Sequence, residues 1–164
     1  MNTVPAVRYF RMGGGSGRRN ADKRMEHGGA WLSASDWPVP GTGFRAYYLH
    51  GDGTLRASPP EDIRDSITFD FDPANPVPTI GGAVTSGEPL MFPGAYDQRT
   101  HDRIYGARAP YLPLEARHDV LVFATPPLAE DMEITGPIAV RLWISSSAPD
   151  TDFTAKLIAW RQAR

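Results

Sequence analysis

The chain has 164 residues, an apolar content of 41% and a formal net charge of −2 at pH 7. This length is sufficient for one domain with a packed core, and the near-neutral charge gives no general reason to expect nucleic acid or membrane as a partner. Cysteine is absent, which excludes disulfides and thiolate metal sites.

The first 12 residues contain no apolar run of signal-peptide length, and no later stretch is long enough to span a bilayer. The absence of cysteine is compatible with a reducing compartment. We therefore expect a cytoplasmic protein, the alternative being that the original N-terminus has been lost.

A glycine-rich, charged stretch over residues 13–35 is predicted to be a loop. It contains Gly-Gly-Gly-Ser-Gly-Arg-Arg, but Arg18 stands where a nucleophile elbow around Ser16 requires its second glycine. The Gly-Lys-Ser/Thr of a phosphate loop is also missing. A solvated loop is favoured over an anion site, which would be built from the basic residues Arg18, Arg19, Lys23 and Arg24.

The next segments favour strands and a long loop. Residues 42–55 are predicted to form a strand, a tight turn at Gly51-Asp52-Gly53 and the start of a second strand. Residues 66–72 alternate in polarity, as expected for a strand with one apolar face. Residues 73–113 hold many of the prolines and are predicted to be a loop that wraps the sandwich or covers a partner surface.

Three further strands are predicted towards the end of the chain. Residues 119–125 are apolar on both faces, as in a central strand. Residues 137–146 and 151–160 alternate in polarity, and no segment of the chain shows a sustained helical period. Strands joined by Gly- and Pro-rich loops indicate an all-β sandwich or jelly roll.

The histidines do not indicate a metal centre. His27, His50, His101 and His118 show neither His-x-x-x-His nor His-Glu-x-x-His spacing, so a surface or capping role is favoured for each. A Ser/His/Asp triad can assemble from distant residues, but the sequence shows neither an elbow nor a strand–helix scaffold for it.

Two Asp-x-Asp pairs, Asp70/Asp72 and Asp150/Asp152, are candidate calcium ligands. Neither is followed by the glycine and glutamate of an EF-hand loop. Asp150 lies between two alternating segments, so we expect its side chain to cap backbone N–H groups in a structural turn. No residue is therefore assigned as catalytic, cofactor-binding or metal-ligating, and no cofactor is expected.

Six segments, all in one order, carry a resemblance to a known family. Residues 119–157, DVLVFATPPLAEDMEITGPIAVRLWISSSAPDTDFTAKL, closely resemble the C-terminal jelly roll of Xaa-Pro dipeptidyl-peptidases and cocaine-esterase-like (CocE/NonD) acyl hydrolases. The upstream segments are VRYF from Val7, DWPVP from Asp36, YYLHGDGTL from Tyr47, DPANPVPTIGG from Asp72 and DQR from Asp97. The resemblance covers about residues 5–158.

The resemblance implies a single partial domain over residues 1–164, an incomplete jelly-roll β-sandwich similar to galactose-binding domains. In this family a separate α/β-hydrolase domain carries the Ser/Asp/His triad, and no position here matches it. The chain is therefore expected to be the non-catalytic C-terminal part of a serine hydrolase, of the dipeptidyl-peptidase or acyl-esterase class, and inactive alone. The alternative is a stand-alone carbohydrate- or ligand-binding module, whose sugar platform would require Trp31, Trp37 and Trp160.

The similarity to the family stops at the end of the chain. Family members continue with more strands, whereas residues 159–164 break off, so we expect part of an apolar face to be uncovered. The expected partners are an α/β-hydrolase catalytic domain, in cis or as a split partner, and further copies of the chain; no nucleic acid and no membrane are expected. The uncovered face is expected to include some of the residues Ile138, Val140, Leu142, Phe153 and Leu157.

Overall fold

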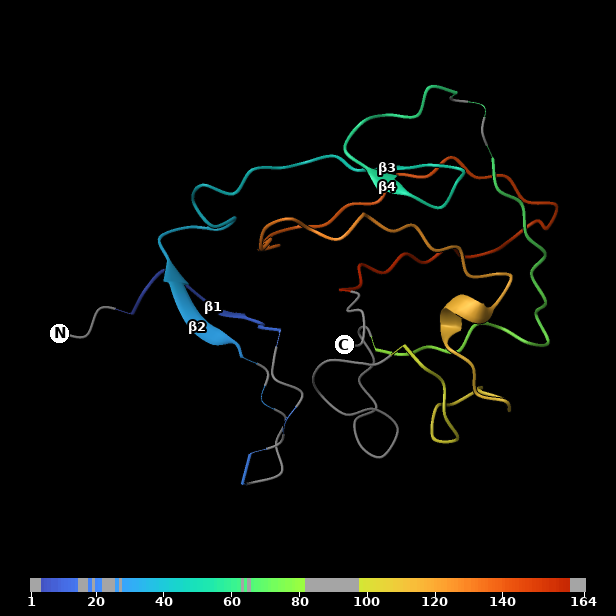
Figure 1. The fold of residues 1–164 in the computed structure, drawn as a ribbon, viewed down its shortest axis with the longest axis horizontal. Helices are drawn as coiled ribbons and strands as arrows, with labels where there is room; N and C mark the ends of the chain where they lie inside the picture. The colour runs from blue at the N-terminus through green and yellow to red at the C-terminus, as the bar shows by residue number, and fades with distance from the viewer. Residues whose placement is uncertain are drawn as a thin grey trace. The chain divides into compact units, whose positions relative to one another are not determined.

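The computed structural model describes residues 4–14, 18, 20–21, 26, 28–62, 64, 66–81 and 98–159 (Figure 1). The elements are, in chain order, β1 (Val7–Arg11), β2 (Ala30–Ala34), β3 (Tyr48–Leu49), β4 (Leu55–Arg56) and a 3-10 turn η1 (Leu114–Ala116). Apart from η1, the regular structure in these ranges is strand, which confirms the all-β class. None of their helical segments has the length and apolar character to cross a membrane.

The chain divides into two compact units. The first unit comprises residues 1–43 and 133–164 and contains β1 and β2. The second unit comprises residues 44–132 and contains β3, β4 and η1.

In the first unit, β1 and β2 form an antiparallel pair with Val7 opposite Ala34 and Arg11 opposite Ala30, drawn in blue in Figure 1. The prediction of a continuous loop over residues 13–35 is therefore wrong at β2. Within Ala-Trp-Leu-Ser-Ala the side chains alternate in exposure, with Leu32 and both alanines on the more covered face. Flanking glycines and charges masked this short alternation, and pairing with β1 is what makes it a strand.

In the second unit, the predicted turn joins β3 and β4, which pair antiparallel with Tyr48 opposite Arg56. Gly53 has a φ of +79°, a conformation that favours glycine, and its N–H donates to the His50 carbonyl at 2.9 Å. The predicted strand over residues 42–50 is confined to Tyr48–Leu49. The hairpin is thus confirmed, with shorter strands than the sequence predicts.

The turn of this hairpin also contacts residues 119–125. Ala124 donates to the Gly53 carbonyl at 3.0 Å and accepts from the Leu55 N–H at 2.9 Å, which gives a parallel bridge between Thr54 and Ala124. The prediction of a central strand over residues 119–125 is wrong beyond this point, because the rest of the segment has no strand partner.

Three other predicted strands are not formed. Residues 66–72, 137–146 and 151–159 carry alternating side chains, but none of them is paired as a strand. No backbone–backbone hydrogen bond involves residues 138–155 within the described ranges. Alternation sets which side chains share a face, whereas strand structure also requires a neighbouring backbone to accept and donate hydrogen bonds.

The buried residues lie in the second unit. Ile80 is 2% exposed and Leu114 is 6% exposed. Asp119 is also buried, at 8% exposed, although it is charged. In the first unit, no residue that the structure describes is buried. The apolar side chains of the first unit are therefore at least partly accessible.

Candidate functional site

The described histidines have backbone partners. His50 donates from Nε2 to the Ser58 carbonyl oxygen at 3.0 Å, and the contact does not involve the Ser58 hydroxyl. His101 accepts the Arg103 N–H at Nδ1 at 3.2 Å, which is the predicted capping role. Neither contact pairs a histidine with a hydroxyl nucleophile, as a triad requires. Ser16, Arg19, Lys23, Arg24 and His27 lie outside the described residues.

The turn around Asp150 is present, but its cap is a different residue. The chain bends at residues 147–149, and Ser146 Oγ accepts the Ala148 N–H at 3.1 Å. In the described ranges no hydrogen bond to Asp150 or Asp152 is formed, so the predicted aspartate cap is wrong. A serine hydroxyl reaches a backbone N–H two residues on and makes the same kind of turn.

The most enclosed polar group is an ion pair that sequence reasoning did not identify. The Asp119 carboxylate is 1% exposed, and both of its oxygens accept hydrogen bonds from Arg117, Oδ1 from Nε at 2.7 Å and Oδ2 from Nη2 at 2.6 Å. This is the bidentate geometry in which guanidinium and carboxylate bind most specifically. The available signal was an Arg-x-Asp pair directly before the apolar run of residues 120–124.

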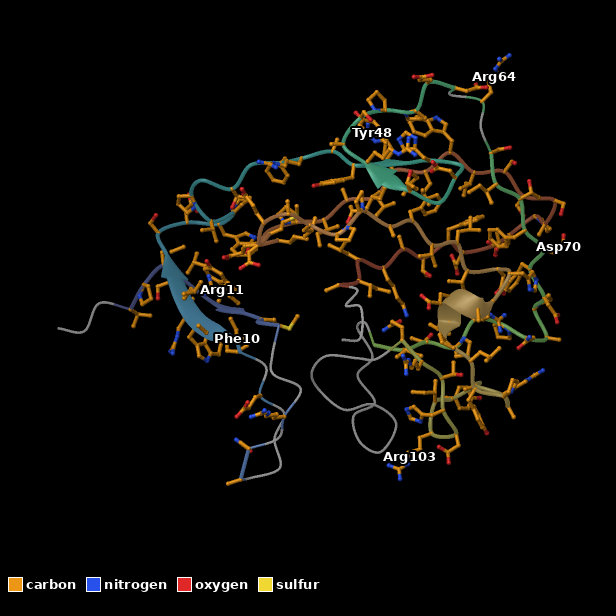
Figure 2. The ribbon with its side chains drawn as sticks, in the orientation of Figure 1. Phe10, Arg11, Tyr48, Arg64, Asp70 and Arg103 are labelled. Atoms are coloured by element: carbon orange, nitrogen blue, oxygen red, sulfur yellow. The ribbon has the colours of Figure 1, made fainter. Side chains whose placement is uncertain are left out.

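Three basic side chains hold residues 70–75 against the segment around η1. Arg117 Nη2 donates to the Asn75 carbonyl at 2.7 Å, and Arg108 Nη2 donates to the Ala74 carbonyl at 3.0 Å. His118 Nε2 lies 3.1 Å from the Asp70 carbonyl oxygen, which can only accept, so this nitrogen is the donor. Asp70, at the start of the segment that these side chains hold, is labelled in Figure 2. We call Arg108, Arg117, His118 and Asp119 the basic clasp.

Within the basic clasp, Arg117 and Asp119 stabilise each other's charge. The hydrogen bonds from Arg117 are the main reason that the pKa of Asp119 is lowered, because they stabilise the charged carboxylate against the cost of burial. The same pair raises the pKa of Arg117. Since guanidinium and carboxylate keep each other charged, and the clasp donors reach backbone carbonyls, the Asn75 side-chain oxygen or this carboxylate, the geometry is that of a structural anchor.

The hairpin of the first unit carries two aromatic contacts on opposite faces. Opposing residues of an antiparallel pair share a face, so Phe10 and Trp31 lie together, with ring centroids 5.3 Å apart. Trp37 instead contacts Tyr9, at 6.1 Å, and Tyr9 lies on the other face of β1. Trp31 and Trp37 therefore do not form one flat platform for a sugar, and Trp160 lies outside the described residues.

The segment after residue 133 exposes apolar side chains, as the sequence predicts. Ile138 is 62% exposed, and Trp143 on the opposite face of the same segment is 89% exposed. Both faces of this segment are therefore accessible. We call the exposed apolar side chains of residues 138–158 the apolar surface. Besides Ile138 and Trp143 it contains Val140, Leu142, Ile144, Phe153, Leu157 and Ile158.

The described residues show side-chain contacts that anchor the backbone, and the histidine contacts among them do not form a catalytic pair. They contain no group of three or more His, Asp or Glu residues that could hold a metal ion. The arrangement contains the enclosed Arg117–Asp119 ion pair and the hydrogen bonds of the basic clasp to the backbone of residues 70–75. It also contains two accessible surfaces rich in apolar side chains, on the β1–β2 hairpin and on residues 138–158.

Comparison with known proteins agrees with this character. The model of a family described as the X-Pro dipeptidyl-peptidase C-terminal non-catalytic domain matches residues 2–163. A cocaine esterase from Rhodococcus sp. (strain MB1 Bresler) is 35% identical over 167 residues, which cover 94% of this chain and 23% of that protein. The chain thus spans about a quarter of the length of this relative. No solved structure matches the chain.

Proposed function

Because the chain belongs to the X-Pro dipeptidyl-peptidase C-terminal non-catalytic domain family, we propose that it is the accessory domain of a serine hydrolase that cleaves ester or amide bonds. The catalytic triad belongs to an α/β-hydrolase domain, joined in cis or supplied as a split partner. The similarity to a cocaine esterase supports an ester-cleaving or amide-cleaving partner. In this proposal the accessory domain folds as a jelly roll and is located in the cytoplasm.

One observation supports this proposal above the others, namely the apolar surface of residues 138–158. Its aliphatic side chains are about half exposed, which is unusual for a folded domain on its own. Full burial of one such side chain is worth roughly 1.5–3 kcal/mol. A large partner domain that covers several of them would therefore gain enough free energy to hold the two domains together.

The clasp suits the same role. A non-catalytic domain contributes by presenting a fixed surface, and fixed surfaces need anchored loops. Arg117 and Arg108 hold the backbone at Asn75 and Ala74, and the enclosed Asp119 holds Arg117 in place. The clasp therefore gives the second unit a defined shape without taking part in bond cleavage.

Reading the coding region on the 5′ side of this chain tests the proposal directly. We expect a frame, continuous or adjacent, that encodes an α/β-hydrolase domain with Gly-x-Ser-x-Gly and a later histidine. When the two parts are produced together, an active-site serine probe should label only the hydrolase part, and the two should co-purify. A locus without any hydrolase frame, or two parts that purify separately, would contradict the proposal.

A further inference from the structure

The outward face of the β1–β2 hairpin combines a cation with two aromatic rings. Arg8, Phe10, Trp31 and Ser33 share this face, because Arg8 is opposite Ser33 and Phe10 is opposite Trp31. Trp31 is 60% exposed, and both Arg8 and Ser33 are exposed as well. We call these four residues the hairpin face.

The side chains of the hairpin face are held in place by one another. The Arg8 guanidinium carbon lies 4.8 Å from the centroid of the Trp31 ring, in a cation–π contact between diagonal positions. Phe10 meets the same ring edge to face at an interplanar angle of 69°. Gly29 lies directly beneath Phe10, since a Cβ added there would be 2.7 Å from its ring. Rings fixed in this way lose little conformational freedom when they bind a partner.

The charge of Arg8 is not neutralised within the described chain. Its neighbour Arg11, on the other face of β1 and labelled with Phe10 in Figure 2, pairs with Glu133 at 3.0 Å. No carboxylate of the described residues lies within ion-pair distance of Arg8. The guanidinium keeps a planar fork of N–H donors, and the Ser33 hydroxyl adds another donor on the same face.

The distribution of charge along the chain indicates which partner suits this face. The first 34 residues hold six Lys or Arg and two Asp or Glu, whereas the rest of the chain holds 11 and 17. Residues 1–34 are therefore a locally positive stretch of sequence in a chain whose remaining residues are net acidic, and Arg8 is the cation that this stretch places on the hairpin face. A long phosphate backbone would also approach the acidic remainder of the chain and be repelled by it. A short acidic segment of a protein can contact the hairpin alone.

From this geometry we infer that the hairpin face is a docking surface for an acidic segment of a protein partner. A carboxylate binds the Arg8 fork and Ser33, while an apolar or aromatic side chain beside it packs on the exposed edge of Trp31. The inference is independent of the proposed hydrolase partner, because it uses residues of the first unit that do not belong to the apolar surface.

Binding of a fluorescein-labelled glutamate decapeptide to the whole 164-residue chain tests the inference, with fluorescence polarisation as the readout. We expect Arg8→Gln to weaken binding at least tenfold and Arg8→Lys to weaken it less, because lysine keeps the charge but loses the fork. Arg141→Gln, which removes the same charge from an exposed arginine elsewhere in the first unit, should change binding less than twofold. The indole N–H resonance assigned through Trp31→Phe should shift when the peptide binds, which shows that the hairpin face itself is occupied.

Four results would overturn the inference. Equal losses for Arg8→Gln and Arg141→Gln, or no binding at low salt, would show that the face does not recognise acidic groups. A thymidine decanucleotide that binds with the same dependence on Arg8 would identify a nucleic-acid surface instead. If Arg8→Gln changed the self-association of the chain but not peptide binding, the occupant would be a second copy.

Discussion

At the scale of single residues, two kinds of aspartate contact differ most clearly in the described ranges. Asp52, Asp62 and Asp72 each accept the backbone N–H of the residue two positions on, at 2.9–3.0 Å, and so hold exposed turns. Asp119 differs, because its carboxylate is enclosed and bound at both oxygens by Arg117. Only in the second case does the loss of a charge leave an enclosed partner without its counter-ion.

The first prediction concerns this pair. We expect Asp119→Asn to lower the free energy of unfolding by about 2 kcal/mol, which is below the range for fully buried pairs because Arg117 keeps some contact with water. Asp150→Asn, which removes an exposed carboxylate without a hydrogen bond, should change it by less than about 0.5 kcal/mol. Urea denaturation followed by circular dichroism measures both, and equal effects would show that the clasp contributes no stability.

The second prediction is the pH dependence of the same group. The folded-state pKa of Asp119 lies below its ordinary value of 3.8, mainly because of the hydrogen bonds from Arg117. Its contribution is therefore complete above pH 3.8 and is lost as the pH falls through the lower folded value. The urea midpoint should drop below about pH 4, and less steeply in Asp119→Asn than in the natural chain. The pKa of Asp52 is also lowered, by its hydrogen bonds with Thr54, so the slope should decrease without disappearing. Identical pH profiles for the two chains would contradict this assignment.

At the scale of elements, β1 and β2 show how a glycine permits strand pairing. A Cβ at Gly29 would lie 2.6 Å from the Arg11 carbonyl oxygen and 2.7 Å from the Phe10 ring. Gly29 directly precedes β2, and the Phe10 ring lies against the backbone of Gly29. The glycine-rich sequence that favoured a loop is thus, at this position, a requirement of the hairpin.

The third prediction follows from this contact. Gly29→Ala should destabilise the first unit by about 1–3 kcal/mol, as overpacking does, because the backbone of β1 cannot move away without breaking the pair. Gly43→Ala is the matched control, since no atom lies within 4 Å of the added Cβ. Hydrogen exchange of the β1 and β2 amides should be faster in Gly29→Ala and unchanged in Gly43→Ala. Unchanged protection in both would mean that the hairpin tolerates a side chain at residue 29.

At the scale of the whole molecule, the exposed apolar side chains determine how the chain behaves alone. Segments with the alternation of strands remain unpaired after residue 133 in the described ranges, and both of their faces are accessible. Such segments present free backbone groups and apolar surface together, which favours association with another protein.

The fourth prediction is self-association of the isolated chain. Light scattering should show species larger than 18.0 kDa, and Ile138→Lys with Ile144→Lys should shift the chain towards the monomer. Ser145→Lys with Ser147→Lys adds the same charge without removing apolar area and should have little effect. A monodisperse monomer with strong hydrogen-exchange protection over residues 138–158 would contradict the prediction.

The fifth prediction is that the isolated chain hydrolyses neither p-nitrophenyl acyl esters nor Xaa-Pro p-nitroanilides above background. The sequence shows no nucleophile elbow, and loss of triad chemistry removes several orders of magnitude in rate. Turnover that co-purifies with the chain and disappears in Ser16→Ala would instead make the glycine-rich stretch an active site.

The sequence by itself determined the all-β class, the turn at Gly51-Asp52-Gly53 and the family, because alternation, turn residues and an ordered set of motifs are local properties of the chain. It also predicted that apolar residues such as Ile138 and Leu157 are exposed after residue 133. Only the tertiary structure decided which alternating segments are paired, that residues 30–34 form a strand, and that Ser146 rather than Asp150 caps its turn. It alone showed that Arg117, while bound to Asp119, also binds Asn75, 42 residues away from it, because a contact between distant segments depends on how the backbone returns in space. The local sequence pattern does not specify which distant segments come into contact.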